Sequence, residues 1–453
     1  MQVEFARVAR ATAGLAAAAV ISFAISAGAQ TNAPLDAAAS DPRVMGWMQG
    51  FPPPPDKLIT QPDANYFSFP KLRWSVCHLR EFLPTEQISR GLEAPIPLDR
   101  LPPDQMAATA AEIDALSFQP MGGDALTPAP MTWAESLLAN YTDGLLILHR
   151  GQVVYEYYAG CLAEDGKHAA MSMTKSVTGL LAQILIAEGA LDETALVADI
   201  IPEIAGSAFA SATVRQVMDM TTGVQFSEDY SDPNADIWLY SAAASPLPKA
   251  EGYQGPNGYF QYLQQVAPDG THGAEFHYKT INSDMLGWIV SRVAGRPVSQ
   301  LASERLWRPM GAEQDAYMTV DGLGVPFAGG GLTAGLRDLG RLGLAVLNGG
   351  MVGERRLFPA EVTARIRAGG DKAKFGDGFP TLAGGSYTSQ WWVLHNAHGA
   401  FAARGVHGQT IYIDPTAEMV LVRFASFPRA QNGLIDPTSL PAYQAVAEYL
   451  MTR

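Results

Sequence analysis

Strand-like segments near both ends of the chain, with helical patterns between them, constrain this fold more than any other feature. Residues 144–160 contain two β-rich runs joined by a short Gly-containing turn, a pattern typical of a hairpin. Residues 410–422 contain a second such pair around an Asp-Pro-Thr turn. Most of residues 190–305 shows helical periods or long loops. The sequence therefore predicts an α+β fold: an antiparallel sheet flanked by helices, plus a mostly helical lobe over roughly residues 190–340.

Three helices can be placed from their patterns. After Ser172, apolar residues at helical spacing over 177–185 predict a long helix. Thr333 is a good N-cap residue and predicts a helix over residues 334–347. A last helix is expected over residues 441–450.

The first 29 residues have the organisation of a secretory signal peptide. Arg7 and Arg10 form a basic start, and residues 11–24 are apolar and rich in Ala. Ala27-Gly28-Ala29 then offers a small-x-small cleavage pattern. The alternative is a retained membrane anchor, for which the apolar stretch is short. We therefore predict a cleaved signal peptide over residues 1–29 and a periplasmic or secreted protein.

Residues 30–130 are rich in Pro and only weakly periodic. Proline lacks a backbone donor and has a fixed φ, so such a segment is expected to run extended over a surface. Its aromatic side chains nevertheless need apolar cover. They are Trp47, Phe51, Tyr66, Phe67, Phe69 and Trp74. The segment is predicted to be an N-terminal arm wrapped on the main body, residues 131–453.

Charge and hydropathy exclude several kinds of partner. The chain of 453 residues carries 31 Lys and Arg against 45 Asp and Glu, a formal net charge of −14. Affinity for nucleic acid comes largely from clustered Lys and Arg, so an acidic chain is a poor candidate for it. Beyond residue 30 there is no run of about 18 or more apolar residues, so no membrane span is expected after signal cleavage.

The chain has two cysteines, Cys77 and Cys161. An oxidising compartment permits a disulfide between them. Two cysteines do not make a framework, however, and two buried thiols are equally compatible with the sequence. The sequence leaves both alternatives open.

The chemistry is expected at Ser172 and Lys175. If Ser172 opens the predicted helix, Lys175 lies one turn on and on the same face. A serine hydroxyl is a weak nucleophile that needs a base, and a lysine can serve when burial lowers its pKa. On spacing alone, a capping serine beside a solvated lysine is the alternative. The same spacing at Ser68 and Lys71 is set aside, because Pro70 lies inside it and no helical period follows.

Two further segments strengthen this hypothesis. Tyr278 lies just before a helical run, where a phenol can point into a cleft. A nearby lysine ammonium favours the phenolate, which can act as a base and then as a proton donor. Standing alone, Tyr278 would be read as a core or surface residue. His407-Gly408-Gln409 precedes a strand, and its glycine lets a ligand approach the backbone closely.

In this chain order, Ser172-x-x-Lys175, Tyr278 and His407-Gly408-Gln409 resemble the serine β-lactamase and penicillin-recognising superfamily. The chain looks closer to the class C-like branch, where Tyr replaces the serine of the S-D-N motif. Within that branch it most resembles the 6-aminohexanoate-dimer (nylon-oligomer) hydrolases and related esterases. The resemblance spans about residues 80–450 and implies a β-lactamase-like fold. The supporting stretches are Ser172–Ser176, Met220–Gly223, Ser227–Tyr230, Leu336–Asp338 and Gly405–Pro415.

The resemblance implies roles for individual residues. Ser172 would be the nucleophile, Lys175 its activating partner and Tyr278 the proton shuttle. The oxyanion hole would be the backbone N–H groups of Ser172 and Thr410. Tyr230 would match a tyrosine that family members use at the substrate amide or amine. Six residues are assigned to substrate binding: Tyr230, Trp238, Asn282, His407, Gly408 and Gln409.

The chain also departs from the family patterns. Thr280 stands where class C enzymes usually have Asn, and Asn282 comes two positions later. His407 stands where the K-T-G lysine grips a β-lactam carboxylate. The nylon-oligomer enzymes hold a substrate ammonium with an Asp eleven residues after the loop tyrosine; here that position is Ser241, with Asp236 nearby.

These features predict a periplasmic serine hydrolase that cleaves small carboxylic esters or linear amides of the 6-aminohexanoate-oligomer type through an acyl-enzyme. No cofactor is expected. No metal is expected either, because His395, His398 and His407 lack ligand spacing. The alternatives are a β-lactamase, a D-alanyl-D-alanine carboxypeptidase-type penicillin-binding protein, or an inactive peptide-binding relative. The sequence does not predict an oligomeric state.

Overall fold

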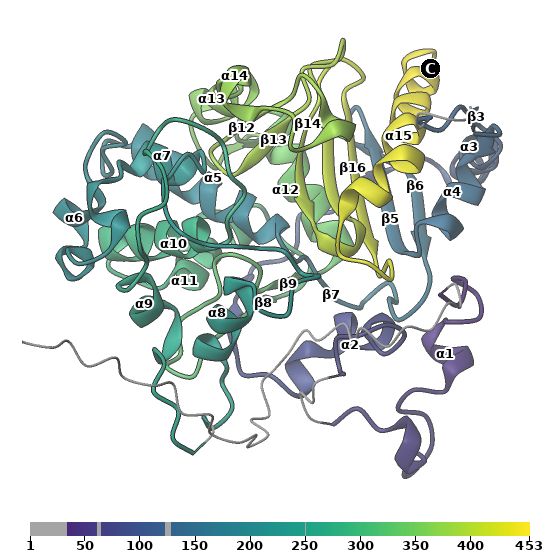
Figure 1. The fold of residues 1–453 in the computed structure, drawn as a ribbon. Helices are drawn as coiled ribbons and strands as arrows, with labels where there is room; N and C mark the ends of the chain where they lie inside the picture. Colours follow the sequence, from purple (N-terminus) through teal and green to yellow (C-terminus); the bar gives the residue numbers. More distant parts are fainter. Residues whose placement is uncertain (1–33, 61–64, 123–127, 250) are drawn as a thin grey trace, which may run out of the picture.

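A computed structural model describes residues 34–60, 65–122, 128–249 and 251–453. The predicted signal peptide lies outside these residues. Figure 1 shows the main sheet beside a lobe of helices, with the first helices of the chain below them. In the described part of the chain, no helix has both the length and the apolar character needed to cross a membrane.

One eight-stranded sheet organises the body of the molecule. In spatial order it runs through β12 (Ser386–Thr388), β13 (Trp391–Val393), β14 (Phe401–Gly405), β15 (Gln409–Asp414), β16 (Met419–Ala425), β5 (Thr142–His149), β6 (Gln152–Tyr158) and β2 (Asp99–Arg100). All neighbours are antiparallel except β2 and β6. β16 pairs directly with β5, so the two predicted hairpins meet at the centre of the sheet. The predicted α+β fold is confirmed.

The two faces of the sheet bury different clusters. On β5, Leu146 and Leu148 face the larger core, whereas Leu145 and Ile147 face the second. This alternation follows from the two-residue period of a strand. The larger core contains α5 (Met173–Ala187) and α12 (Leu336–Leu347). Helices from both ends of the chain cover the other face: α3 (Pro103–Asp114), α4 (Trp133–Ala139) and α15 (Asp436–Met451).

The lobe of helices lies against α5. It comprises α6 (Val197–Ile200), α7 (Val214–Met218), α8 (Asp236–Ala244), α9 (Gly258–Leu263), α10 (Ile281–Ala294) and α11 (Val298–Ala302). A second sheet, in the order β1 (Thr85–Ile88), β8 (Ala316–Thr319), β9 (Leu332–Ala334) and β7 (His168–Ala169), was not expected from the sequence. The remaining elements are α1 (Pro42–Met45), α2 (Leu72–His78), β3 (Ser117–Phe118), β4 (Met131–Thr132), β10 (Met351–Val352), β11 (Arg355–Arg356), α13 (Ala360–Ala368) and α14 (Lys372–Phe375).

Two predicted helix starts are wrong. Thr333 is not an N-cap: it lies inside β9, paired with Ala169 and Tyr317, and α12 begins only after Gly335. A β-branched residue fits a buried strand well, and pairing with two neighbours outweighs its capping preference. The last helix begins at Asp436 rather than 441, because Pro437 is compatible with a first helical turn.

The N-terminal segment is fastened to the body by a disulfide and a buried arginine. Cys77 of α2 is bonded to Cys161, with their Cα atoms 6.0 Å apart, which settles the alternative left open above. The Arg73 guanidinium donates to Asp143 Oδ1 at 3.1 Å and to Ser426 Oγ at 3.1 Å. The predicted arm is less extended than expected, because it contains α2 and α3, and its strands β1 and β2 are part of the four-stranded and the eight-stranded sheet.

Candidate active site

Ser172 and Lys175 lie at the start of α5, at the junction of the lobe and the main sheet (Figure 1). Ser172 occupies the N-cap position and Lys175 follows one turn later on the same side. The Lys175 ammonium nitrogen Nζ donates to Ser172 Oγ at 3.1 Å and to the Gly329 carbonyl at 2.5 Å. The predicted pairing of the two side chains is therefore present.

Burial governs the protonation of Lys175, whose residue is only 1% exposed. Desolvation lowers its pKa below the ordinary lysine value, because a buried ammonium loses its hydration. The carboxylates of Glu228 and Asp284 act in the opposite direction. The net shift favours a neutral amine, which is the form that can accept a proton from Ser172.

The turn before α5 holds Ser172 against the main sheet. Met171 has a φ of +47°, a left-handed conformation that is unusual for a non-glycine residue. On the other side, a Cβ on Gly405 of β14 would lie 2.8 Å from the Ala170 carbonyl and 3.0 Å from Ser172 N. Only glycine lets β14 come this close to the nucleophile turn.

Tyr278 joins this pair from the segment before α10. Its ring centroid lies 5.3 Å from Lys175 Nζ, and Ser172 is among the groups that act on the pKa of its phenol. Burial and the nearby Glu228 carboxylate raise the pKa of Tyr278 well above that of an ordinary phenol. The phenolate expected from the sequence is therefore not favoured: a buried Lys175 and Tyr278 are more stable as amine and phenol than as an ion pair.

An aromatic wall encloses Tyr278. Trp392 of β13 stacks on its ring at a centroid distance of 5.4 Å, and Tyr387 of β12 meets it edge-on at 6.1 Å. Arg404 of β14 lies over Trp392, 5.5 Å from its centroid, and forms a buried ion pair with Asp436. The wall fixes the phenol against the end of the main sheet.

Thr410 lies beside this region on β15, opposite Arg404 of β14. Thr410 is 6% exposed and also pairs with Arg423 of β16 on the other side. Its predicted oxyanion role stays a prediction.

Tyr230 and Trp238 belong to the loop and helix that face Tyr278 from the lobe. The Tyr230 hydroxyl donates to Glu228 Oε1 at 2.7 Å, and its ring meets Trp238 edge-on at 6.1 Å. The Trp238 indole donates to the Asp232 carbonyl at 2.7 Å. Glu228 also accepts from Thr280, two residues after Tyr278, so the loop of Tyr230 lies beside the Tyr278 segment. The role of Tyr230 at the substrate stays a prediction.

Two residues assigned to substrate binding are internal. Asn282 is fully buried: its Oδ1 accepts from Thr222 at 2.6 Å and its amide donates to the Lys279 carbonyl. Gln409 is also fully buried and bonds to both backbone groups of Ala425. The substrate-binding prediction is wrong for both residues, because a buried amide with satisfied partners has no group left for a ligand.

His407 and Gly408 form the turn between β14 and β15. The His407 ring nitrogen Nδ1 is hydrogen-bonded to the Phe427 carbonyl at 2.7 Å, and burial lowers its pKa to about 4. Gly408 is buried, has a φ of +100° and accepts from the Arg423 guanidinium at 2.9 Å. Gly408 thus shapes the turn, and its predicted part in substrate binding stays a prediction, while His407 is a neutral group at physiological pH.

The two residues considered for the substrate ammonium take part in local hydrogen bonds. Ser241 donates back to Ile237 of its own helix at 2.7 Å. Asp236 accepts from Ser227 N at 2.8 Å through Oδ2 and links the loop to α8. Of the two, only Asp236 carries a carboxylate, and it is partly exposed.

Sequence reasoning missed two carboxylates. Glu228 accepts from Tyr230 and from Thr280, although its stretch had been noted only for Tyr230. Asp284, 2% exposed, accepts from Gly329 N at 3.0 Å; burial raises its pKa to about 7. Gly329 opens a run of three glycines that leads into β9. Nothing in the sequence indicated that Lys175 would bond to its carbonyl.

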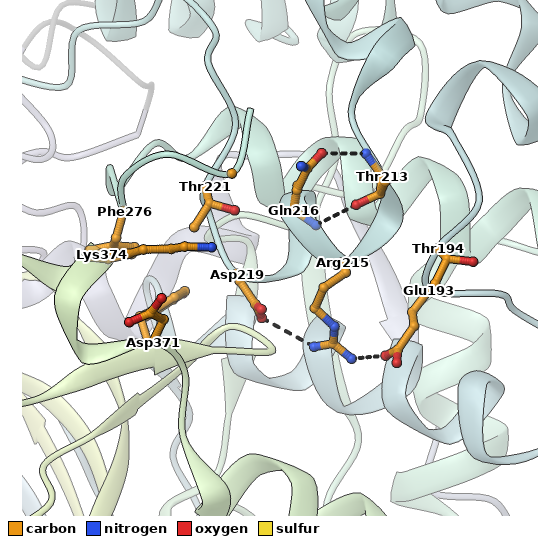
Figure 2. Close-up of a pocket in the computed structure, with 12 residues that line it drawn as sticks. Glu193, Thr194, Thr213, Arg215, Gln216, Asp219, Thr221, Phe276, Asp371 and Lys374 are labelled. Carbon is orange, nitrogen blue, oxygen red and sulfur yellow. Dashed lines mark hydrogen bonds and ion pairs between the residues drawn. The ribbon is translucent and has the colours of Figure 1, made fainter. Parts of the chain in front are cut away.

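A separate cavity of about 350 Å³ lies in the lobe between α7 and α14. Figure 2 shows Arg215 in it, bonded to Asp219 on one side and to Glu193 on the other. The cavity shares Tyr387 with the aromatic wall, but the side chains of Ser172, Lys175 and Tyr278 are not in its lining. It therefore adjoins the candidate active site without including its reacting groups.

Potential metal ligands are few. Among the described residues, Cys77, Cys161 and His168 form the one group of three with suitable spacing, and both sulfurs are used by the disulfide. His395 is bonded to Ser386 and His398 to Asp414.

The arrangement of the site is that of a serine hydrolase: a serine at a helix start, a buried lysine one turn on, and a phenol against both. The β-lactamase family profile matches residues 135–438. The chain is 34% identical over 361 residues to the 6-aminohexanoate-dimer hydrolase of Paenarthrobacter ureafaciens, covering 79% of this chain and 86% of that protein. The chain therefore belongs to the β-lactamase family and is a serine hydrolase close to the 6-aminohexanoate-dimer hydrolases.

Solved structures agree with this assignment. A Bacillus anthracis protein, named as a candidate 6-aminohexanoate-dimer hydrolase, superimposes with a TM-score of 0.74 at 30% identity and covers 88% of this chain and 99% of its own. A penicillin-binding protein homologue from Caulobacter crescentus has a TM-score of 0.53 at 18% identity, covering 69% of this chain and 96% of its own. The second similarity is one of fold alone.

Proposed function

We propose that this hydrolase cleaves carboxylic esters or linear amides of the 6-aminohexanoate-oligomer type through an acyl-enzyme on Ser172. The observation that carries the proposal is the 3.1 Å hydrogen bond between the buried Lys175 amine and Ser172 Oγ. A nucleophilic serine needs an adjacent base, and burial prepares Lys175 for that role.

The reaction divides into two transfers. Ser172 Oγ attacks the substrate carbonyl while its proton passes to Lys175, and the N–H groups of Ser172 and Thr410 stabilise the oxyanion. The Tyr278 phenol gives its proton to the leaving alcohol or amine and is reprotonated from Lys175. Water then attacks the acyl group and loses its proton to this pair, and Ser172 is released with the acid product.

Tyr230 and Trp238 are proposed to line the substrate side of the cleft. Each contributes an aromatic ring. The Tyr230 hydroxyl is hydrogen-bonded to Glu228 and the Trp238 indole to the Asp232 carbonyl. His407, neutral and bonded to Phe427, offers no cation to a carboxylate. These features favour an uncharged or amine-bearing acyl chain over a β-lactam.

Export to the periplasm or the medium is part of the proposal. The signal-like residues 1–29 motivate it. The disulfide between Cys77 and Cys161 supports it, because such bonds persist mainly in oxidising compartments.

Active-site labelling tests the proposed nucleophile. A fluorophosphonate should form one adduct, located by peptide mass spectrometry at Ser172, and Ser172→Ala should lose both label and esterase activity. Ser68→Ala, which removes the other Ser-x-x-Lys serine, is the matched control and should behave as wild type. Labelling at Ser68, or full activity in Ser172→Ala, would contradict the proposal. A pre-steady-state burst with p-nitrophenyl butyrate distinguishes an enzyme from an inactive binding relative.

A further inference from the structure

One carboxylate ties together the two segments that bring phenols to the site. Glu228 Oε1 accepts from the Tyr230 hydroxyl at 2.7 Å and from Thr280 Oγ1 at 2.7 Å. Its Oε2 accepts from the Thr280 backbone N–H at 2.6 Å. Thr280 lies two residues after Tyr278 and caps α10. Through these three bonds, the loop of Tyr230 and the segment of Tyr278 are held in one arrangement.

Glu228 is also a source of negative charge beside the reacting groups. Its carboxylate stabilises the Lys175 ammonium and opposes ionisation of the Tyr278 phenol. The other charges that act on the pair come from different elements: Asp284 of α10 on Lys175, and Arg404 of β14 on Tyr278. Asp284 is committed to Gly329 and Tyr240, and Arg404 to Asp436.

Two phenols lie near the Glu228 carboxylate. The Tyr230 hydroxyl donates a hydrogen bond to it, and its charge also acts on Tyr387 of β12 through space. The three hydrogen bonds to Glu228 hold its carboxylate between the two phenol-bearing segments.

We propose that Glu228 is a positioning residue of this active site. It holds Tyr230 and Tyr278 in a fixed relative position and shifts the equilibrium of the proton that Lys175 and Tyr278 exchange. The inference rests on the proposed function and goes beyond it, since it concerns a residue that need not touch substrate. It predicts that charge and position can be separated by substitution.

Glu228→Gln removes the charge and keeps the size. Because the negative charge raises the pKa of both Lys175 and Tyr278, its removal should lower the apparent pKa of the pair. We expect the alkaline rise of kcat/KM, measured on a butyrate ester in a pH-stat, to move to lower pH by about one unit. We also expect kcat to fall about tenfold: the amide keeps one accepting oxygen but its NH2 group cannot accept, so at least one of the hydrogen bonds from Tyr230 and Thr280 is lost.

Two further variants separate position from charge. Thr280→Val retains the Glu228 charge but removes one hydrogen bond, so it should lower kcat and leave the pH midpoint unmoved. Glu275→Gln, three residues before Tyr278, is the matched control. The Glu275 side chain is 72% exposed and pairs with His277. It should leave both kcat and the midpoint at wild-type values.

The outcomes discriminate clearly. A uniform loss of rate in Glu228→Gln with an unmoved midpoint would mean a merely structural role and overturn the proposal, as would wild-type behaviour. If Glu228→Gln does not fold, Glu228→Asp decides, because a wild-type rate with this shorter carboxylate would also overturn it. Fluorophosphonate labelling of the wild type at Ser172 is read in parallel. Its absence would refute the proposed function itself, whereas labelling with an unaffected Glu228→Gln would refute only this inference.

Discussion

The buried amine–phenol pair at Lys175 and Tyr278 is the feature on which the chemistry depends at the scale of single residues. The sequence was enough to predict that Ser172, Lys175 and Tyr278 lie together, because the Ser–Lys spacing is local and the order of motifs in the family identifies the tyrosine. It did not predict the protonation states of Lys175 and Tyr278. Those depend on burial and on Glu228 and Asp284, which approach from other elements. The assignment of Asn282 and Gln409 to substrate binding failed because each side chain bonds to another element: Asn282 to Thr222, and Gln409 to Ala425 on the neighbouring strand.

Lys175→Arg should be inactive. Arginine stays protonated at any working pH and cannot accept the Ser172 proton. We expect a loss of about 10²–10⁴-fold in kcat/KM, the range for a general base. In the wild type, the base must be unprotonated, so activity should rise with pH. Since burial lowers the pKa of Lys175, the midpoint should lie below an ordinary lysine value. It belongs to the coupled pair rather than to one residue. An active Lys175→Arg would rule out a basic role.

His407 should limit activity on β-lactams. With its pKa lowered to about 4, the imidazole is neutral at pH 7 and cannot pair with the drug's carboxylate. Nitrocefin hydrolysis should therefore be weak or absent, while short-chain p-nitrophenyl esters turn over well. A kcat/KM for nitrocefin well above that for p-nitrophenyl butyrate would contradict the proposed specificity.

At the scale of elements, the hairpins and the long helix were predictable because each has a strong local period. The small sheet of β1, β7, β8 and β9 was not, because its strands are two to four residues long and come from distant parts of the chain. Thr333 shows the consequence: its local preference indicated a cap, but pairing with Ala169 and Tyr317 decided its conformation. Where β14 meets α5, a glycine makes the contact possible.

Gly405→Ala should damage the site more than the fold. The added Cβ would press on the Ala170 carbonyl and on Ser172 N, which are backbone atoms that cannot move aside cheaply. We expect a fall in kcat of about tenfold or more, together with a destabilisation of about 1–3 kcal/mol. Gly433→Ala, which meets no atom within 4 Å, is the control and should leave both unchanged. Steady-state kinetics and thermal melting measure the two effects, and wild-type kcat in Gly405→Ala would refute the close approach.

At the scale of the whole molecule, the N-terminal segment is part of the surroundings of the active site. Phe67 meets the His407 ring edge-on at 5.9 Å, and Met171, the residue before the nucleophile, lies in the same apolar cluster. The composition of the N-terminal segment predicted an extended arm, and its aromatic residues indicated that the arm packs against the main body. The disulfide and the Arg73 network could not be predicted, since both depend on the folded path of the chain.

Loss of the disulfide should destabilise the protein. Cys77 and Cys161 are 84 residues apart, so the bond restricts a long loop in the unfolded chain. Removal of a bond of this kind costs about 2–5 kcal/mol. The double variant Cys77→Ser/Cys161→Ser should therefore melt several degrees lower than the oxidised wild type, and reductant should lower only the wild-type melting temperature. Equal melting temperatures in all cases would contradict a stabilising bond.

The measurement that tests the central claim most directly is the capture of the acyl-enzyme. The wild type is mixed with p-nitrophenyl butyrate, quenched in acid within the burst, and digested for mass spectrometry. The account predicts a butyryl group on Ser172, and none in Ser172→Ala. A burst accompanied by acylation at another residue, or turnover with no acylated serine, would contradict it.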